Sequence, residues 1–92
     1  MKINNGFILR QINSTDGILN VVIAVGKNAS ALNGYLTLNS SAVFLWNELK
    51  SDKTKEQLVD ALLSEFDVSR EIAQKDVDNF ILNLKKLGAI DE

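Results

Sequence analysis

The sequence contains no cysteine and no histidine. Without cysteine, neither a disulfide scaffold nor a thiolate metal site can form. Without histidine, the chain lacks the commonest general base and the commonest metal ligand at neutral pH. A lysine, a carboxylate or a tyrosine could still catalyse a reaction. These absences favour a binding function, however, and we predict a protein that is not an enzyme and that holds no metal or cofactor.

Long apolar runs are also absent. The first six residues, Met-Lys-Ile-Asn-Asn-Gly, lack the apolar segment of a signal peptide. The longest candidate run, residues 18–25, is interrupted by Asn20. It is far shorter than the ~20 apolar residues that a helix needs to cross a bilayer. We therefore expect a cytoplasmic protein without a membrane segment.

The composition indicates one folded domain over residues 1–92. A chain of 92 residues leaves little room for a second domain. Apolar residues make up 46% of the chain and are spread along its length, which argues against a disordered tail. Charge is uneven, because residues 1–39 carry a net charge of +2 and residues 40–92 carry −4. The C-terminal half should therefore repel polyanions on average.

The first part of the chain has the pattern of a sheet. Hydrophobic periodicity predicts strands over residues 7–12, 18–25 and 34–39. The turn formers at residues 13–17, which include Asp-Gly, predict a hairpin between the first two strands. One face of the second strand is bulkier than the other, and we expect it to face the core. That face carries Leu19, Val21, Ile23 and Val25.

The second part has the pattern of helices, predicted over residues 41–50, 55–66 and 70–87. Polar side chains that can cap a helix occur at residues 39–41, at Thr54 and at Ser69. The third helix carries an apolar seam with spacings of 4, 3, 4 and 3, formed by Ala73, Val77, Phe80, Leu84 and Leu87. Gly88 is a natural terminator. Three strands followed by three helices predict an α+β fold.

No catalytic or metal motif stands out. The five glycines are isolated, so none forms a phosphate loop. Residues 67–71 lack the alternating ligands and the glycine of a calcium loop. We interpret the many carboxylates as a solvated helical surface.

The last two helices have a helix-turn-helix outline, which makes a winged-helix nucleic-acid-binding protein the alternative function. The third helix mixes basic and acidic side chains, and its half of the chain carries −4, which disfavours DNA binding. A homodimer that forms through a free sheet edge, or by strand exchange, is a further possibility.

The third strand becomes an edge if the three strands form a simple meander. Leu82 lies opposite the seam of the third helix, and Ile81 lies on its shoulder. An exposed leucine alone means nothing. Beside an open strand edge, however, apolar shoulders can form a groove that receives the side chains of an added strand.

The segment at residues 33–39, followed by residues 42–46, resembles the Leu-Asn…Trp block of the PqqD family, small proteins named for pyrroloquinoline-quinone biosynthesis. The pattern continues in register to Leu87 and Gly88. The turn at residues 50–53 lacks the glycine of the founding members. This departure favours a broader role in peptide modification over quinone biosynthesis itself.

The resemblance implies a winged-helix-like peptide-recognition domain, a RiPP recognition element. Such domains bind the leader segment of a ribosomally made precursor peptide as an extra strand beside the third strand. They present the precursor to a modifying enzyme, commonly a radical SAM maturase, and thus act as non-catalytic peptide chaperones. The implied peptide contacts lie on the third strand and the third helix: Gly34, Tyr35, Leu36, Thr37, Leu38, Asp78, Ile81, Leu82 and Lys85.

Overall fold

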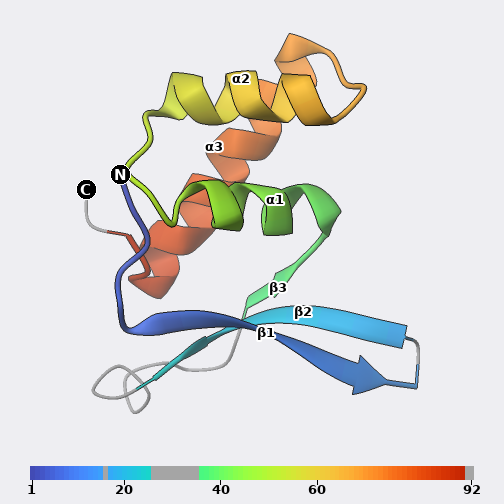
Figure 1. Cartoon of the computed structure of the whole chain (residues 1–92), viewed down its shortest axis with the longest axis vertical. Coiled ribbons are helices and arrows are strands. Elements are labelled where there is room, and N and C mark those ends of the chain that lie inside the picture. Colours follow the sequence, from blue (N-terminus) through green and yellow to red (C-terminus); the bar gives the residue numbers. More distant parts are fainter. Residues whose placement is uncertain (16, 26–35, 91–92) are drawn as a thin grey trace.

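The computed structural model describes residues 1–15, 17–25 and 36–90, in which three strands precede three helices (Figure 1). The strands are β1 (Phe7–Ser14), β2 (Gly17–Ala24) and β3 (Leu36–Leu38). The helices are α1 (Ser40–Glu48), α2 (Lys55–Glu65) and α3 (Arg70–Leu87). This order confirms the predicted α+β class, and the bounds of α3 coincide with those predicted. Strand β3 is shorter than predicted at its C-terminal end because Asn39 caps α1.

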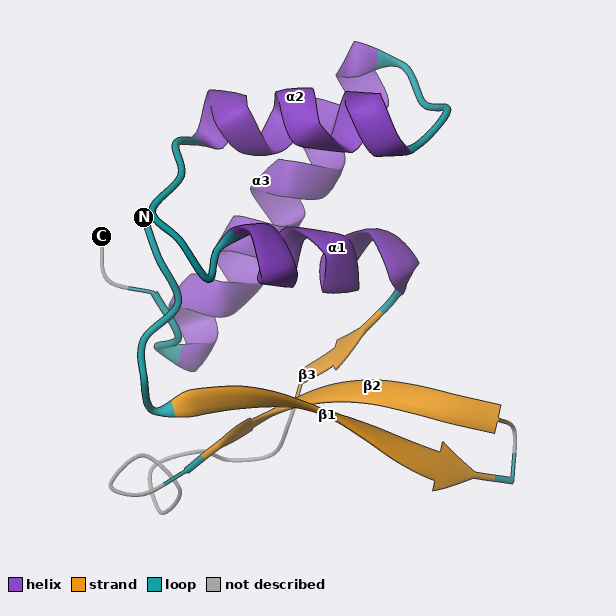
Figure 2. Cartoon of the chain, viewed as in Figure 1, coloured by secondary structure: helices purple, strands orange, loops and turns teal. Residues whose placement is uncertain are grey.

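The sheet is antiparallel in the order β1-β2-β3, so β1 and β3 are its edges. The predicted hairpin is confirmed, with pairs running from Phe7 and Ala24 to Ser14 and Gly17. Gly17 has φ 117°, a conformation that side chains disfavour. The hairpin is much longer than β3, and all three helices lie on one side of the sheet (Figure 2).

The helices pack against the face of β2 that carries Val22. This side chain is 0% exposed and belongs to the hydrophobic core together with Phe7 and Leu38. Val22 pairs with Leu9 of β1 and with Leu36 of β3. Directly paired residues point to the same face of a sheet. All three strands therefore contribute to the face that the helices cover.

The sequence prediction placed the opposite set of β2 residues in the core, and this prediction was wrong. Of the set Leu19, Val21, Ile23 and Val25, none belongs to the cluster that the helices cover. Leu19 is 38% exposed, and Val21 is buried on the other face. The prediction compared side-chain bulk within one strand, whereas Phe7 of the neighbouring strand supplies much of the bulk on the core face.

Side-chain caps fix the helix ends, as the sequence predicts. Asn39, Thr54 and Ser69 each accept a hydrogen bond from a backbone amide in the first turn of α1, α2 and α3. Gln57 completes a capping box by accepting the amide hydrogen bond of Thr54 at 2.9 Å. Gly88 ends α3 in the left-handed conformation, with φ 82°.

The helices meet in one core. It holds the predicted α3 seam from Ala73 to Leu84 and, from α1, Trp46 and Leu49. Phe44 packs edge to face against Phe66, with ring centroids 5.6 Å apart. None of the helices in the described part of the chain is long and apolar enough to cross a membrane.

The N-terminal segment runs between the end of α1 and the end of α3. The Ile3 amide donates to the Leu49 carbonyl at 3.0 Å. Ile3 also forms an antiparallel bridge with Ile90, so the segment before β1 lies beside the residues that follow α3. The Met1 ammonium lies 2.6 Å from Asp52 and lowers the pKa of that carboxyl group.

We predict that Leu84→Ala lowers the free energy of unfolding by about 2–5 kcal/mol, because it leaves a cavity in the core. Leu84 is 0% exposed, whereas Leu82, on the same helix, is 49% exposed. Leu82→Ala is the matched control and should change stability by less than about 0.5 kcal/mol. Urea unfolding followed by circular dichroism measures both. Equal effects of the two substitutions would contradict the packing described for α3.

Candidate functional site

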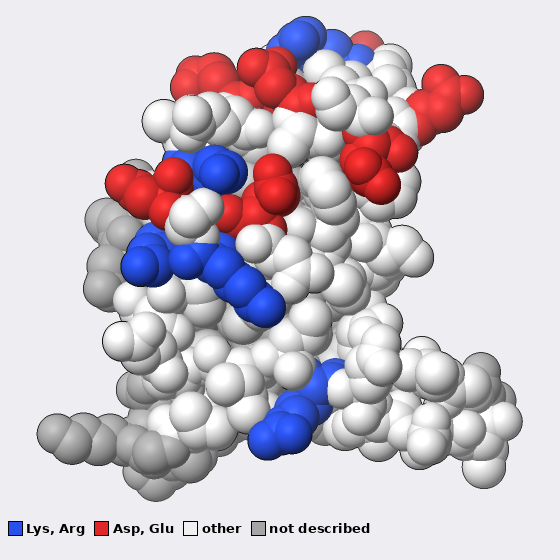
Figure 3. Space-filling view, viewed as in Figure 1, with Lys and Arg blue, Asp and Glu red and all other residues white. Residues whose placement is uncertain are grey.

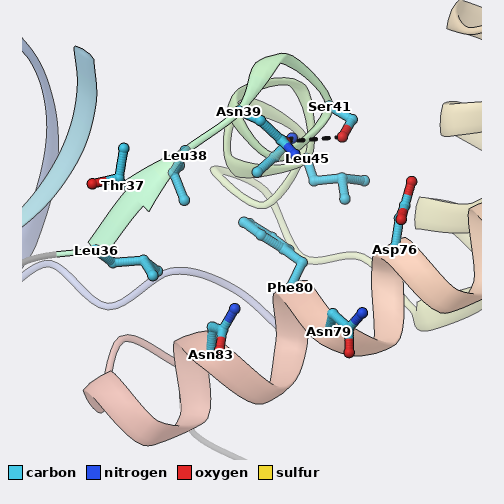
Figure 4. A pocket seen from close by; sticks show the side chains of 11 residues that line it. Leu36, Thr37, Leu38, Asn39, Ser41, Leu45, Asp76, Asn79, Phe80 and Asn83 are labelled. Carbon is cyan, nitrogen blue, oxygen red and sulfur yellow. Dashed lines mark hydrogen bonds between the residues drawn. The ribbon is translucent and has the colours of Figure 1, made fainter.

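A groove lies between β3 and α3, beside the open edge of the sheet (Figure 4). Its volume is about 200 Å³. Leu36 and Leu38 project from the strand toward Phe80, whose ring projects from α3 into the same space. The start of α1 borders one end. The lining residues are Leu36, Thr37, Leu38, Asn39, Ser41, Ala42, Leu45, Asp76, Asn79, Phe80 and Asn83.

The outer edge of β3 is open in the described part of the chain, where β3 pairs with β2 alone. An unpaired strand edge presents amide and carbonyl groups that an added strand can bond. Leu38 is 5% exposed and belongs to the core, so it can offer a guest mainly its backbone. Leu36 is partly exposed at the groove, and Thr37 is exposed.

Helix α3 presents one aromatic ring and a row of short polar side chains to this groove. The Phe80 ring is buried and packs in the core. Asn79 and Asn83 are exposed, and Asp76 is partly buried. Each amide can both donate and accept hydrogen bonds, and the carboxylate accepts them. The groove therefore combines an apolar floor with a polar wall, which suits a peptide better than a purely apolar ligand.

The structure divides the residues predicted for peptide binding into two groups. Leu36, Thr37 and Leu38 line the groove beside β3. The four helix residues line a different depression of about 330 Å³, together with Met1 and Lys55. Those four residues are Asp78, Ile81, Leu82 and Lys85. Gly34 and Tyr35 lie outside the described residues.

Helical geometry explains why the four helix residues do not face β3. Each residue advances about 100° around a helix, so Lys85 lies about 140° from Phe80. Ile81 is buried in the core. Asp78 forms an ion pair with Lys55 at the start of α2. These side chains therefore lie on the other shoulder and the outer side of α3 and not in the β3 groove, which corrects their predicted placement, while their contact with a peptide stays a prediction.

Sequence reasoning missed the α3 residues that do line the groove. Asp76, Asn79 and Asn83 are spaced by 3 and 4 residues, which places them along one side of the apolar seam. This spacing is a usable signal. The spacing alone does not show which side of the apolar seam faces β3, because that orientation depends on how α3 packs against the rest of the protein.

The groove is lined by hydrogen-bonding groups around one aromatic ring. Within residues 1–15, 17–25 and 36–90, no group of three or more acidic, histidine or cysteine side chains is placed to hold a metal ion. The groove supplies hydroxyl, amide and carboxylate groups around Phe80. These groups recognise peptide bonds and polar side chains by hydrogen bonding.

Two solved structures share this fold. One is described as TbiB1 in complex with the TbiA(beta) leader peptide; it is 22% identical to this chain, with a TM-score of 0.73. That likeness covers 99% of this chain and 95% of the other. The second is described as lasso peptide synthetase B1 complexed with the leader peptide, at 23% identity and a TM-score of 0.61. It covers 91% of this chain and 95% of the other.

Comparison with curated protein sequences finds no significant match. A family model, described as Coenzyme PQQ synthesis protein D (PqqD), matches residues 20–90. These residues include most of β2 and all of β3, α1, α2 and α3. Because this match covers most of the length of the chain, the chain belongs to the PqqD family.

Proposed function

We propose that the protein is a non-catalytic chaperone that binds the leader segment of a ribosomally synthesised precursor peptide. The leader adds as a strand to the open edge of β3 and lies in the groove against α3. Residues 1–92 act as one recognition domain, which presents the precursor to a modifying enzyme. The observation that carries this proposal is the open strand edge beside a groove lined by Leu36, Phe80 and short polar side chains.

The dimensions of the groove suit a short extended segment. The three residues of β3 span about 10 Å. The stretch of α3 from Asp76 to Asn83 also spans about 10 Å. A guest of three or four residues matches this length. Its main chain would bond to β3, at a net ~0.5–1.5 kcal/mol per hydrogen bond. Alternate side chains would point into the groove and toward solvent.

The similar proteins support the same class of ligand, because both are described as complexes with leader peptides. The proposal also includes a partner enzyme that modifies the precursor. The PqqD resemblance implies a radical SAM maturase, whereas one similar protein is described as a lasso peptide synthetase. Both fit a recognition domain that holds the leader while another protein modifies the core segment.

The charge distribution favours a peptide over a nucleic acid. Acidic and basic side chains are interleaved over the helices on the visible face (Figure 3). The polar wall of the groove carries a carboxylate and two amides, with Asp76 beside Asn79 and Asn83. Phosphate groups would be repelled by that carboxylate, and nucleic-acid affinity depends on phosphate contacts.

We predict that Asn83→Arg weakens leader binding about tenfold or more, because its long side chain fills the groove beside Leu36. The ligand is a synthetic peptide with the sequence of the cognate leader segment, and calorimetric titration measures its affinity. In an NMR titration of the wild type, the same peptide should shift the amide signals of Leu36, Thr37 and Leu38 more than those of the hairpin.

Gln74→Arg is the matched control. It makes the same kind of amide-to-arginine change at an exposed α3 position that lines a different depression. Its affinity for the leader should stay within twofold of the wild type. Chemical shifts confined to β1, the other sheet edge, would contradict binding at β3. Equal loss of affinity in both variants would contradict the groove.

We also predict that the protein shows no steeply salt-dependent binding to DNA. Fluorescence anisotropy with a labelled duplex at about 50 and 200 mM salt measures this, since real phosphate contacts lose orders of magnitude of affinity over that range. Tight binding at low salt that collapses at the higher salt would favour the nucleic-acid alternative.

A further inference from the structure

The groove beside β3 continues past the start of α1. A second depression, of about 340 Å³, is lined by Asn39, Ser40, Ser41, Leu62, Phe66, Val68 and Asp76. It shares Asn39, Ser41 and Asp76 with the first groove. The two depressions therefore adjoin at these three residues, and together they are called the channel. The channel runs from Leu36 and Asn83, past Asp76, to an apolar end formed by the C-terminal part of α2 and the turn before α3.

Asp76 stands where the two depressions meet, and of the described residues that line them it is the one with a charged side chain. It is partly buried, and within the described residues it has no hydrogen bond or ion pair. Two other carboxylates differ in this respect: Asp78 pairs with Lys55, and Asp60 pairs with Arg70. A partly buried carboxylate without an ion pair can form a charge-assisted hydrogen bond with a cation of the guest.

The channel thus has three sites in a fixed order. Leu36 and Phe80 form an apolar site at one end, and Asp76 forms an anionic site in the middle. Phe66 and Val68 form an apolar site at the other end. Figure 4 shows the Asp76 carboxylate directed toward the side of Ser41, away from the Phe80 ring. Side chains of an extended guest would meet these sites one after another.

We propose that this channel selects leader segments that carry a lysine or arginine between two apolar residues, with Asp76 as the specificity-determining residue. The inference rests on the proposed function. One apolar guest side chain packs on Leu36 and Phe80, the cation pairs with Asp76, and the second apolar side chain enters the depression at Phe66 and Val68. The guest therefore extends beyond the three residues of β3.

A purely structural role for Asp76 makes a different prediction. The carboxylate lies near the first turn of α1, and a negative charge is favourable at a helix N-terminus. If that were its whole role, Asp76→Asn would lower stability and leave the choice of guest residues unchanged. A readout of peptide selectivity therefore separates recognition from stabilisation.

The test is a displayed library of random twelve-residue peptides selected on the wild-type protein, Asp76→Asn and Asp78→Asn. We expect peptides selected on the wild type to carry a lysine or arginine at one position between two apolar positions. Asp76→Asn should lose the basic preference and keep the apolar ones. Asp78→Asn, the matched control on the outer side of α3, should keep all three.

A synthetic peptide from the selection gives the magnitude. Replacing its basic residue with norleucine should weaken binding to the wild type roughly tenfold, as expected for a hydrogen-bonded charge. The same replacement should change binding to Asp76→Asn less than twofold. Val68→Asn should lose only the second apolar preference, which tests the far end of the channel independently of Asp76. Urea unfolding verifies that each variant is folded.

The outcomes separate this inference from the proposed function. If enriched peptides shift the β3 amide signals but carry no basic preference, the leader function stands and the role of Asp76 is overturned. The same holds if Asp76→Asn keeps the basic preference of the wild type. If no peptide is enriched, or if enriched peptides leave β3 unshifted, the proposed function itself is contradicted.

Discussion

One hydrogen bond, from the Ala42 amide to the Asn39 side-chain oxygen at 3.0 Å, fixes where β3 stops and α1 begins. Leu38, directly before it, is anchored in the core. The strand is thereby held between a buried side chain and a capped helix, and its outer edge is unpaired among the residues that the structure describes. An open edge is an aggregation hazard in most proteins, and a very short strand limits it. The described residues of β3, Leu36 to Leu38, provide a short edge on which a guest strand can pair.

The features that the sequence predicted are mostly local. The caps at Thr54 and Ser69 depend on contacts within one helical turn, and the seam of α3 depends on spacing within one helix. The hairpin follows from its turn chemistry. Each of these features can be derived from a short stretch of chain, because the interactions that stabilise it lie within that stretch.

The features that the sequence did not predict depend on packing between elements. Val22 faces the helices because Leu9 and Leu36 flank it on the neighbouring strands, which no pattern within β2 reveals. Likewise, α3 has a polar shoulder at Asn79 and an apolar one at Ile81. Because the shoulder at Ile81 is apolar, the sequence predicted that this shoulder would line the groove. The structure instead buries Ile81 in the core and turns the polar shoulder toward β3.

The energetics of strand addition show why the side chains of the channel matter. Ordering a flexible guest costs about 1–2 kcal/mol per residue in backbone entropy. Each main-chain hydrogen bond to β3 returns a net ~0.5–1.5 kcal/mol, which about offsets the entropy lost by each ordered residue. Main-chain bonding alone therefore leaves little affinity and no sequence preference. Useful affinity has to come from side chains that fill the apolar ends and from a cation at Asp76, so the same contacts that raise affinity also determine which leader is bound.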